Sequence, residues 1–223
     1  MSVSEPAGFR AMGVSCGIKS GKLDLALVQN LGPNFDFAAV FTTNEVKAAP
    51  VLWSEQIAKT SKAKAILLNS GGANACTGPE GFAVTHKSAE VLAEQLGLAP
   101  IDIAVCSTGI IGEQLDLEKI RVGIGALTST NDNDGALAAQ AILTTDSKRK
   151  EVFLNNSGYS IGGMAKGAGM LAPSLATMLV VITTDADLSS LNLNEMLVAA
   201  ANSTFNRISS DGCTSTNDSI MLM

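Results

Sequence analysis

The sequence has little charge. Asp, Glu, Lys and Arg together make up 16% of the 223 residues, below the ~25% that is usual for globular proteins. The net charge of −6 argues against nucleic acid as a partner, because nucleic-acid-binding surfaces are basic. Lys and Arg are scattered, and no basic run favours a membrane surface. Such a chain is expected to bury much of its surface, partly against another subunit.

Histidine and cysteine are scarce, which limits the chemistry available. The single histidine, His86, is placed at the start of an expected helix at 86–97, where a structural or surface role is favoured over a catalytic one. The cysteines have no CxxC pair and no metal-ligand spacing, so no metal is expected. We expect all four to be reduced and buried as small apolar side chains; they are Cys16, Cys76, Cys106 and Cys213.

Targeting and membrane signals are missing from the sequence. The first residues, MSVSEPAGFRAMG, lack the charged and apolar regions of a secretory signal. Apolar runs such as Met178 to Ile182 are far shorter than the about 20 residues of a membrane helix. These features predict a cytoplasmic protein with no membrane partner.

Apolar runs rich in β-branched residues alternate with helical patterns, which predicts an α/β or α+β fold. Strands are expected at 62–70 and 101–109, on either side of the helix at 86–97. Two more are expected at 23–29 and 37–43, with the turn LGPN between them. The remaining expected elements are helices at 134–143 and 191–206 and strands at 151–156, 159–163 and 178–185.

The chain ends in SIMLM, which has the pattern of the first half of a strand. An apolar end in mid-strand would leave an exposed sheet edge, and such edges promote aggregation. We therefore expect residues 1–223 to be an incomplete part of one longer domain.

The glycine-rich run GGMAKGAGMLAPSLATMLVVITTD starts at Gly162. A phosphate-binding loop is disfavoured, because Lys166 precedes the later glycines and a strand follows where a helix is required. Thr177 stands at the entrance of that strand. Cleavage after Ala176 would give Thr177 a free α-amine, whose pKa of about 7.7–8.0 in model compounds suits a base for its own hydroxyl. From chemistry alone, a Gly/Pro loop leading into a strand is the favoured explanation.

The run GGMAKGAGMLAPSLATML closely resembles the self-cleavage signature of the bifunctional glutamate N-acetyltransferase family of arginine biosynthesis (ornithine acetyltransferase / N-acetylglutamate synthase). Further collinear matches include GFRAMGVSCGIK, AAVFTTNEVKAAPV, NSGGANACTG, CSTGIIGE and FNRISSDGCTSTND. The resemblance implies a self-cleaving acyltransferase fold of mixed sheets packed with helices. It also implies an α chain of residues 1–176, a β chain beginning at Thr177 (here 177–223), and an assembly of two α and two β chains.

The same resemblance implies roles for individual residues. Thr177 is the implied nucleophile, and Thr108 and Gly109 the implied oxyanion hole; by itself, STG is simply a strand-ending turn. Lys166 and Thr144 are implied substrate contacts. Lys166 has the alternative of a solvated loop lysine, and Thr144 that of a helix cap, with its neighbour Thr145 equally placed.

The implied reaction is ping-pong acetyl transfer from N-acetylornithine to glutamate through acetyl-Thr177. It needs no cofactor, although some relatives also take acetyl-CoA as a donor. Cys213 replaces an aspartate of the family's DGDTSTND pattern, which is expected to weaken the local turn. The family's chains continue beyond Met223 and carry further substrate contacts there. Two alternatives stay open: an N-terminal-nucleophile amidase or aminopeptidase, and an inactive truncated remnant.

Overall fold

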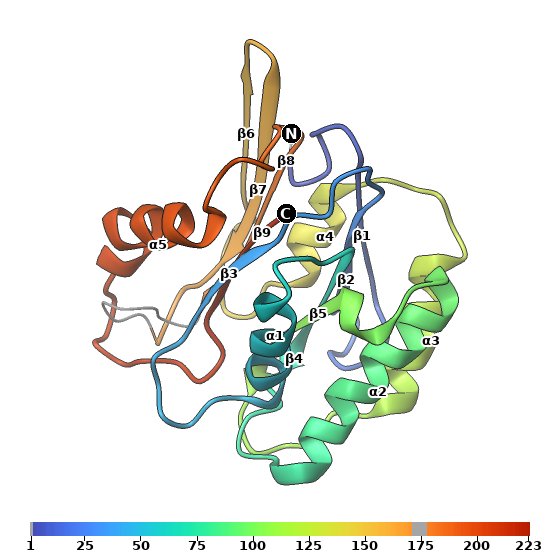
Figure 1. Cartoon of the computed structure of the whole chain (residues 1–223). Helices are drawn as coiled ribbons and strands as arrows, with labels where there is room; N and C mark the ends of the chain where they lie inside the picture. Colours follow the sequence, from blue (N-terminus) through green and yellow to red (C-terminus); the bar gives the residue numbers. More distant parts are fainter. Residues whose placement is uncertain (1, 171–177) are drawn as a thin grey trace.

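The computed structural model describes residues 2–170 and 178–223 and contains two mixed β-sheets with helices packed on them (Figure 1). The first sheet has the order β1-β2-β4-β5, in which β4 and β5 are parallel and the other pairs antiparallel. Its strands are β1 (Phe9–Val14), β2 (Leu25–Asn30), β4 (Ala65–Gly72) and β5 (Ile103–Ile110).

The second sheet has the order β3-β9-β8-β7-β6, and only β8 and β9 pair in parallel among its strands. In Figure 1 the β6–β7 hairpin projects beyond the body of the molecule. The strands are β3 (Ala38–Phe41), β6 (Lys150–Asn156), β7 (Tyr159–Lys166), β8 (Leu179–Thr184) and β9 (Ser219–Leu222).

Five α-helices and two short 3-10 turns lie within the described residues. Helices α2 and α3 pack on the outer face of the first sheet, and α5 packs on the outer face of the second. Helices α1 and α4 contact β5 and β1, the two edge strands of the first sheet. The elements are α1 (Ala49–Lys59), α2 (Gly78–Leu96), α3 (Leu117–Thr128), α4 (Gly135–Ala141), α5 (Leu193–Ser203), η1 (Pro100–Asp102) and η2 (Phe205–Arg207).

Successive side chains of the central strands face different layers of the fold. On β4, Ile66 and Leu68 join a buried cluster that also contains Val181 of the second sheet, so the two sheets pack face to face. Leu67, between them in sequence, belongs to the cluster under α2 and α3. Val180 of β8 likewise points to the layer of α5. Successive strand side chains point to opposite faces, and these strands are therefore apolar on both.

The expected strand–helix–strand unit is confirmed by β4, α2 and β5. Its helix starts earlier than expected, at Gly78, and the prediction that it begins at His86 is wrong. Pro79 occupies the first turn, where its missing N–H costs nothing. The acid expected at the start of the helix at 134–143 is confirmed: Asp134 accepts hydrogen bonds from the amides of Ala136 and Leu137.

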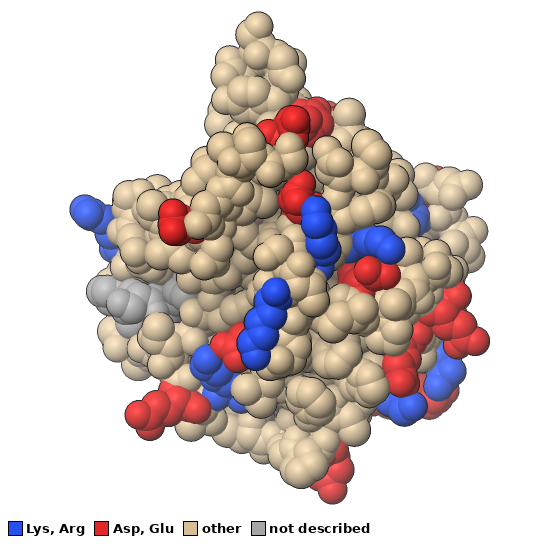
Figure 2. All heavy atoms as spheres, viewed as in Figure 1, with Lys and Arg blue, Asp and Glu red and all other residues tan. Residues whose placement is uncertain are grey.

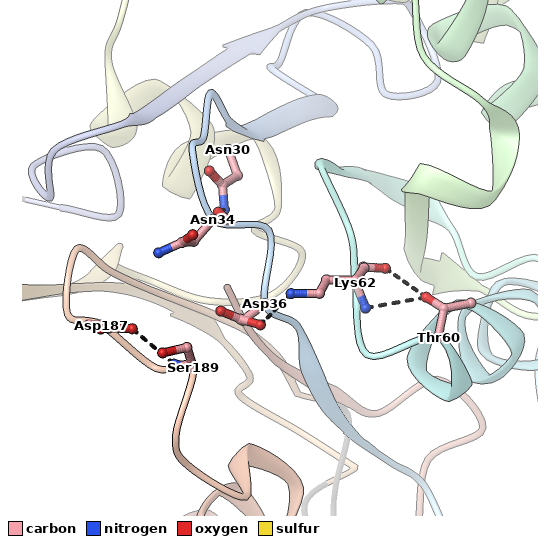
Figure 3. Close-up of polar contacts among 7 residues, drawn as sticks. All are labelled: Asn30, Asn34, Asp36, Thr60, Lys62, Asp187 and Ser189. Atoms are coloured by element: carbon pink, nitrogen blue, oxygen red, sulfur yellow. Dashed lines mark hydrogen bonds and ion pairs between the residues drawn. The ribbon is translucent and has the colours of Figure 1, made fainter.

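The predicted strands β2 and β3 both exist, but they belong to different sheets. The connection between them is held by polar contacts (Figure 3). The Asn30 side chain donates to the carbonyl of Asn34 at 2.9 Å. Lys62, just before β4, forms a 2.6 Å ion pair with Asp36. These contacts direct the chain from the first sheet to the second.

The C-terminal segment forms β9, which pairs with β3 on one side and β8 on the other. The expected exposed edge at this strand is therefore absent, and Met223 is only 2% exposed. Charged side chains on the face shown in Figure 2 form small mixed groups. Among the described residues, no helix has the length and apolar character needed to cross a bilayer.

Candidate functional site

A cavity of about 590 Å³ lies where β4 and β5 of the first sheet and β7 of the second end. Four of the predicted site residues line it: Thr108, Gly109, Thr144 and Lys166. They come from three separate segments of the sequence, so only the fold brings them together. Ala176 and Thr177 lie outside the described residues. The rest of the lining includes Lys19, Gly71, Ala73, Thr145, Met170 and Ser215 to Asn217.

The backbones of β4 and β5 approach each other closely at this end. Gly109 has φ +136 and pairs with Gly71. A Cβ at Gly109 would lie 2.3 Å from the carbonyl carbon of Gly71, which no side chain can tolerate. Glycine is therefore required for this junction, and it brings the backbone of the predicted oxyanion pair to the cavity wall.

Lys166 ends β7 and is 2% exposed, so the alternative of a solvated loop lysine is wrong. Its Nζ donates to Oγ1 of Thr108 at 3.1 Å. Burial lowers the pKa of Lys166 to about 8, although the carboxylates of Asp146 and Asp218 favour its charged form. A buried ammonium whose hydrogen-bond partner among the described residues is a neutral hydroxyl is suited to receive an anionic ligand.

The segment after α4 carries Thr144 and an acid, Asp146. Oδ1 of Asp146 accepts the Gly167 amide at 2.7 Å and also pairs with Lys150. Burial would raise the pKa of Asp146, but these two donors and the positive charge of Lys166 outweigh it and hold the pKa below its usual value. Asp146 thereby links this segment to the end of β7. Thr144 and Thr145 both line the cavity, so either is placed to contact a substrate.

Asp218 is a residue of this region that the sequence reasoning missed. It is fully buried, and its Oδ1 accepts the Met178 amide at 2.8 Å. Met178 directly follows Thr177 in the sequence. Oδ2 of Asp218 is also buried and accepts no hydrogen bond from the described residues. Burial raises the pKa of Asp218 to about 7, against the opposing effects of the Met178 amide, the nearby Ser215 hydroxyl and Lys166.

Asn217 fixes the start of β9 to the first sheet. Its side-chain amide donates to the carbonyls of Ala73 at 2.6 Å and Ser107 at 2.9 Å. Ala73 lines the cavity, and Ser107 directly precedes the cavity residue Thr108. In the sequence, Asn217 and Asp218 belong to the polar run TSTND directly before an apolar strand, within the family match FNRISSDGCTSTND, but neither was assigned a role.

The four cysteines are free thiols and differ in burial. Cys16 and Cys106 are buried, as expected, but Cys76 and Cys213 are exposed, so the expectation is wrong for these two. The amide of Cys213 donates to Asp211 at 3.2 Å, so a turn hydrogen bond is present at this position.

His86 lies on the surface, with its ring 4.9 Å from that of Trp53 and its Nε2 3.7 Å from Glu90. It does not line the cavity. Within residues 2–170 and 178–223, no three His, Cys, Asp or Glu side chains gather in a way that could hold a metal.

Comparison with known proteins gives a consistent result. The sequence model of the ArgJ family matches residues 10–223. The chain is 55% identical to the arginine biosynthesis bifunctional protein ArgJ of Streptomyces coelicolor, over 100% of this chain and 59% of that protein. Identity to the protein of the same name from Mycobacterium tuberculosis is 52%, over 99% of this chain and 57% of the relative. The chain thus spans less than two thirds of these curated relatives.

Two solved structures are similar in fold. The ornithine acetyltransferase of Mycobacterium tuberculosis, determined in complex with ornithine, has a TM-score of 0.76 and 50% identity. The match covers 80% of this chain and 96% of that one. The ArgJ protein of Bacillus halodurans has a TM-score of 0.68 and 32% identity, covering 80% and 95% of the two chains.

Proposed function

The chain belongs to the ArgJ family, and on this basis we propose that it is part of an acetyltransferase of arginine biosynthesis. The reaction transfers the acetyl group of N-acetylornithine to glutamate through an ester on Thr177. Thr177 becomes a chain N-terminus when the bond after Ala176 is cut by self-cleavage. The observation that carries the proposal is the cavity shared by Thr108, Gly109, Thr144 and Lys166.

The cleavage step requires attack of the Thr177 hydroxyl on the Ala176 carbonyl. The peptide nitrogen leaves as an amine and an ester forms, which water then hydrolyses. The products are a new carboxylate at Ala176 and an α-amine at Thr177. The anchoring of the Met178 amide by Asp218 supports this step, because it fixes the residue directly after the nucleophile Thr177.

In the first half-reaction, the Thr177 α-amine accepts the proton of its own hydroxyl as the oxygen attacks the acetyl carbonyl of N-acetylornithine. The amide bond breaks, ornithine leaves with its amine protonated, and acetyl-Thr177 remains. The tetrahedral oxyanion is stabilised by donors at Thr108 and Gly109; removing one such donor typically costs about 10²–10³ in rate. The ammonium of Lys166 binds the substrate carboxylate.

In the second half-reaction, the α-amine of glutamate attacks the ester, and N-acetylglutamate leaves as the Thr177 hydroxyl is restored. Neither half-reaction consumes a cofactor, and acetyl-CoA is a further candidate donor for the same ester. We place the enzyme in the cytoplasm, as an assembly of two α and two β chains.

Intact-mass measurement tests the cleavage, using the protein expressed with any natural continuation of its reading frame. The wild type is expected to give two fragments that meet between Ala176 and Thr177, whereas Thr177→Ala stays whole. An uncut wild type, or an alanine variant cut at the same bond, would contradict the proposal.

The amidase alternative differs in the fate of the acyl group. A hydrolase passes it to water, so release of ornithine from N-acetylornithine would not depend on glutamate. We expect ornithine release beyond the first turnover to require glutamate. An inactive remnant would neither cleave itself nor bind either substrate.

A further inference from the structure

We propose that Lys19 is a specificity residue of the same cavity, which binds the second carboxylate of the acetyl acceptor while Lys166 binds the first. This inference rests on the proposed function and names a contact that distinguishes glutamate from a monocarboxylate. It is carried by the loop that presents Lys19 and by the charges around the cavity.

The loop between β1 and β2 is held in a defined shape by Asp24, which is fully buried. One carboxylate oxygen of Asp24 accepts the amide of Cys16 at 2.6 Å, and the other accepts the amide of Lys19 at 2.7 Å. The backbone of Asp24 is itself fixed, because its carbonyl accepts the Ser70 amide at 2.9 Å. Lys19 is therefore presented by an ordered turn attached to β4.

The turn packs directly on the end of β4. Gly71 has φ +103, and a Cβ there would lie 2.7 Å from Cγ2 of Ile18 and 2.9 Å from Cγ of Lys19. The absence of a side chain at Gly71 lets the aliphatic part of Lys19 lie against the strand. The Lys19 ammonium then reaches the carbonyl of Leu143 at 2.8 Å, directly before Thr144. The Lys19 side chain therefore forms part of the wall of the cavity.

The cavity is thus lined by two lysine side chains, Lys19 and Lys166. Burial lowers the pKa of Lys19, with a smaller contribution from Lys22, while Asp24 opposes the shift. Burial is the main cause of the lowered pKa of Lys166, and the charges of Lys150 and Lys19 make smaller contributions in the same direction. Two like charges in one cavity repel each other, and bound carboxylates would relieve this repulsion.

The nearby carboxylates favour the charged forms of both lysines: Asp24 favours that of Lys19, and Asp146 and Asp218 favour that of Lys166. Asp146 is paired with Lys150 and with the Gly167 amide. Burial raises the pKa of Asp218 to about 7, so near neutral pH it carries only part of a negative charge. Among the described residues, the Nζ atom of Lys19 donates one hydrogen bond, to the carbonyl of Leu143, and that of Lys166 donates one, to the hydroxyl of Thr108. An ammonium has three N–H donors, so both retain donors for a ligand.

A dicarboxylate amino acid offers one carboxylate to each lysine ammonium, whereas its amide analogue offers a carboxylate to only one of them. Glutamine matches glutamate in shape and lacks the second negative charge. Calorimetric titration of the mature protein with each ligand therefore isolates the contribution of that charge. It requires no acetyl transfer, so it is separate from the test of Thr177.

We expect the wild type to bind glutamate at least about tenfold more tightly than glutamine, which corresponds to one charge-assisted hydrogen bond. Lys19→Met should abolish this preference and leave the affinity for glutamine unchanged. Lys19→Arg should retain most of it. Lys22→Met is the matched control, because Lys22 belongs to the same loop but is exposed and outside the cavity lining; it should behave as wild type.

Three results would overturn the proposal. An unchanged preference for glutamate in Lys19→Met would show that Lys19 does not bind the carboxylate. An equal loss of affinity for both ligands would show that Lys19 only shapes the loop. Failure of the wild type to bind glutamate would show that glutamate is not the ligand of this cavity. A changed preference without any acetyl-Thr177 would instead support the contact and contradict the proposed reaction.

Discussion

The Nζ atom of Lys166 lies 3.1 Å from Oγ1 of Thr108, and this buried hydrogen bond joins the two sheets at the cavity. Lys166 ends β7 of the second sheet, and Thr108 lies near the end of β5 in the first. The position of the cation therefore depends on the packing of both sheets. Because the Thr108 hydroxyl accepts from Lys166, its own hydrogen is available for another acceptor.

Removing that hydroxyl is predicted to impair catalysis more than folding. Thr108→Val keeps the shape of the side chain but removes the hydroxyl as a donor to the oxyanion and as the hydrogen-bond partner of Lys166. We expect kcat for acetyl transfer to fall by about 10²–10³. Thr108→Ser retains the hydroxyl and should keep most of the activity. Equal rates for the valine and serine variants would contradict the assigned role.

Gly109→Ala is predicted to destabilise the protein, because the added Cβ would collide with the backbone of Gly71. We expect the free energy of unfolding to fall by about 1–3 kcal/mol beyond the effect of backbone conformation alone. Gly112→Ala measures that backbone effect, since Gly112 has φ +87 but a Cβ at this position would meet no atom within 4 Å. Urea unfolding of both variants makes the comparison. Equal losses would show that the close approach of β4 and β5 carries no cost.

Asp218 is predicted to make stability fall as the pH rises. Its folded pKa of about 7 lies above the ordinary value of 3.8, so the folded state holds the proton more tightly than the unfolded state. The resulting stabilisation is complete below about pH 4 and is lost as the pH rises through about 7. Lys166, with a folded pKa of about 8, remains charged over most of this range.

Asp218→Asn should therefore flatten the dependence of Tm on pH between about pH 5 and 7.5, since an amide does not titrate. Its carbonyl oxygen can still accept the Met178 amide, which keeps the fold. Asp187→Asn is a surface control, because among the described residues Asp187 accepts a local hydrogen bond from the Ser189 amide (Figure 3). This variant should follow the wild type. Parallel curves for wild type and Asp218→Asn would contradict the buried, protonated state of Asp218.

Local sequence patterns were sufficient for most strands but not for their partners. Apolar runs located β4, β5 and β8, because strands buried on both faces are apolar along their whole length. They did not show that β2 and β3 enter different sheets, since that depends on long-range pairing. The strand β1 and the helices α1 and α3 were not anticipated at all.

The candidate site divides in a similar way. The family resemblance indicated Thr108, Gly109 and Lys166, whose gathering at one cavity then followed from the fold. Asp218 and Lys19 were not found, because their significance comes from burial and from neighbours distant in sequence. A carboxylate in the polar run TSTND gives no sign that it will be fully buried against Met178.

Acetyl labelling tests the central claim most directly. The mature protein is incubated with N-acetylornithine labelled in its acetyl group, without glutamate, and is then denatured in acid and mapped by peptide mass. We predict one labelled peptide, carrying the acetyl group on the N-terminal residue Thr177 and losing it when glutamate is added before denaturation. Label on any other residue, or turnover with glutamate but no label on Thr177, would contradict the account.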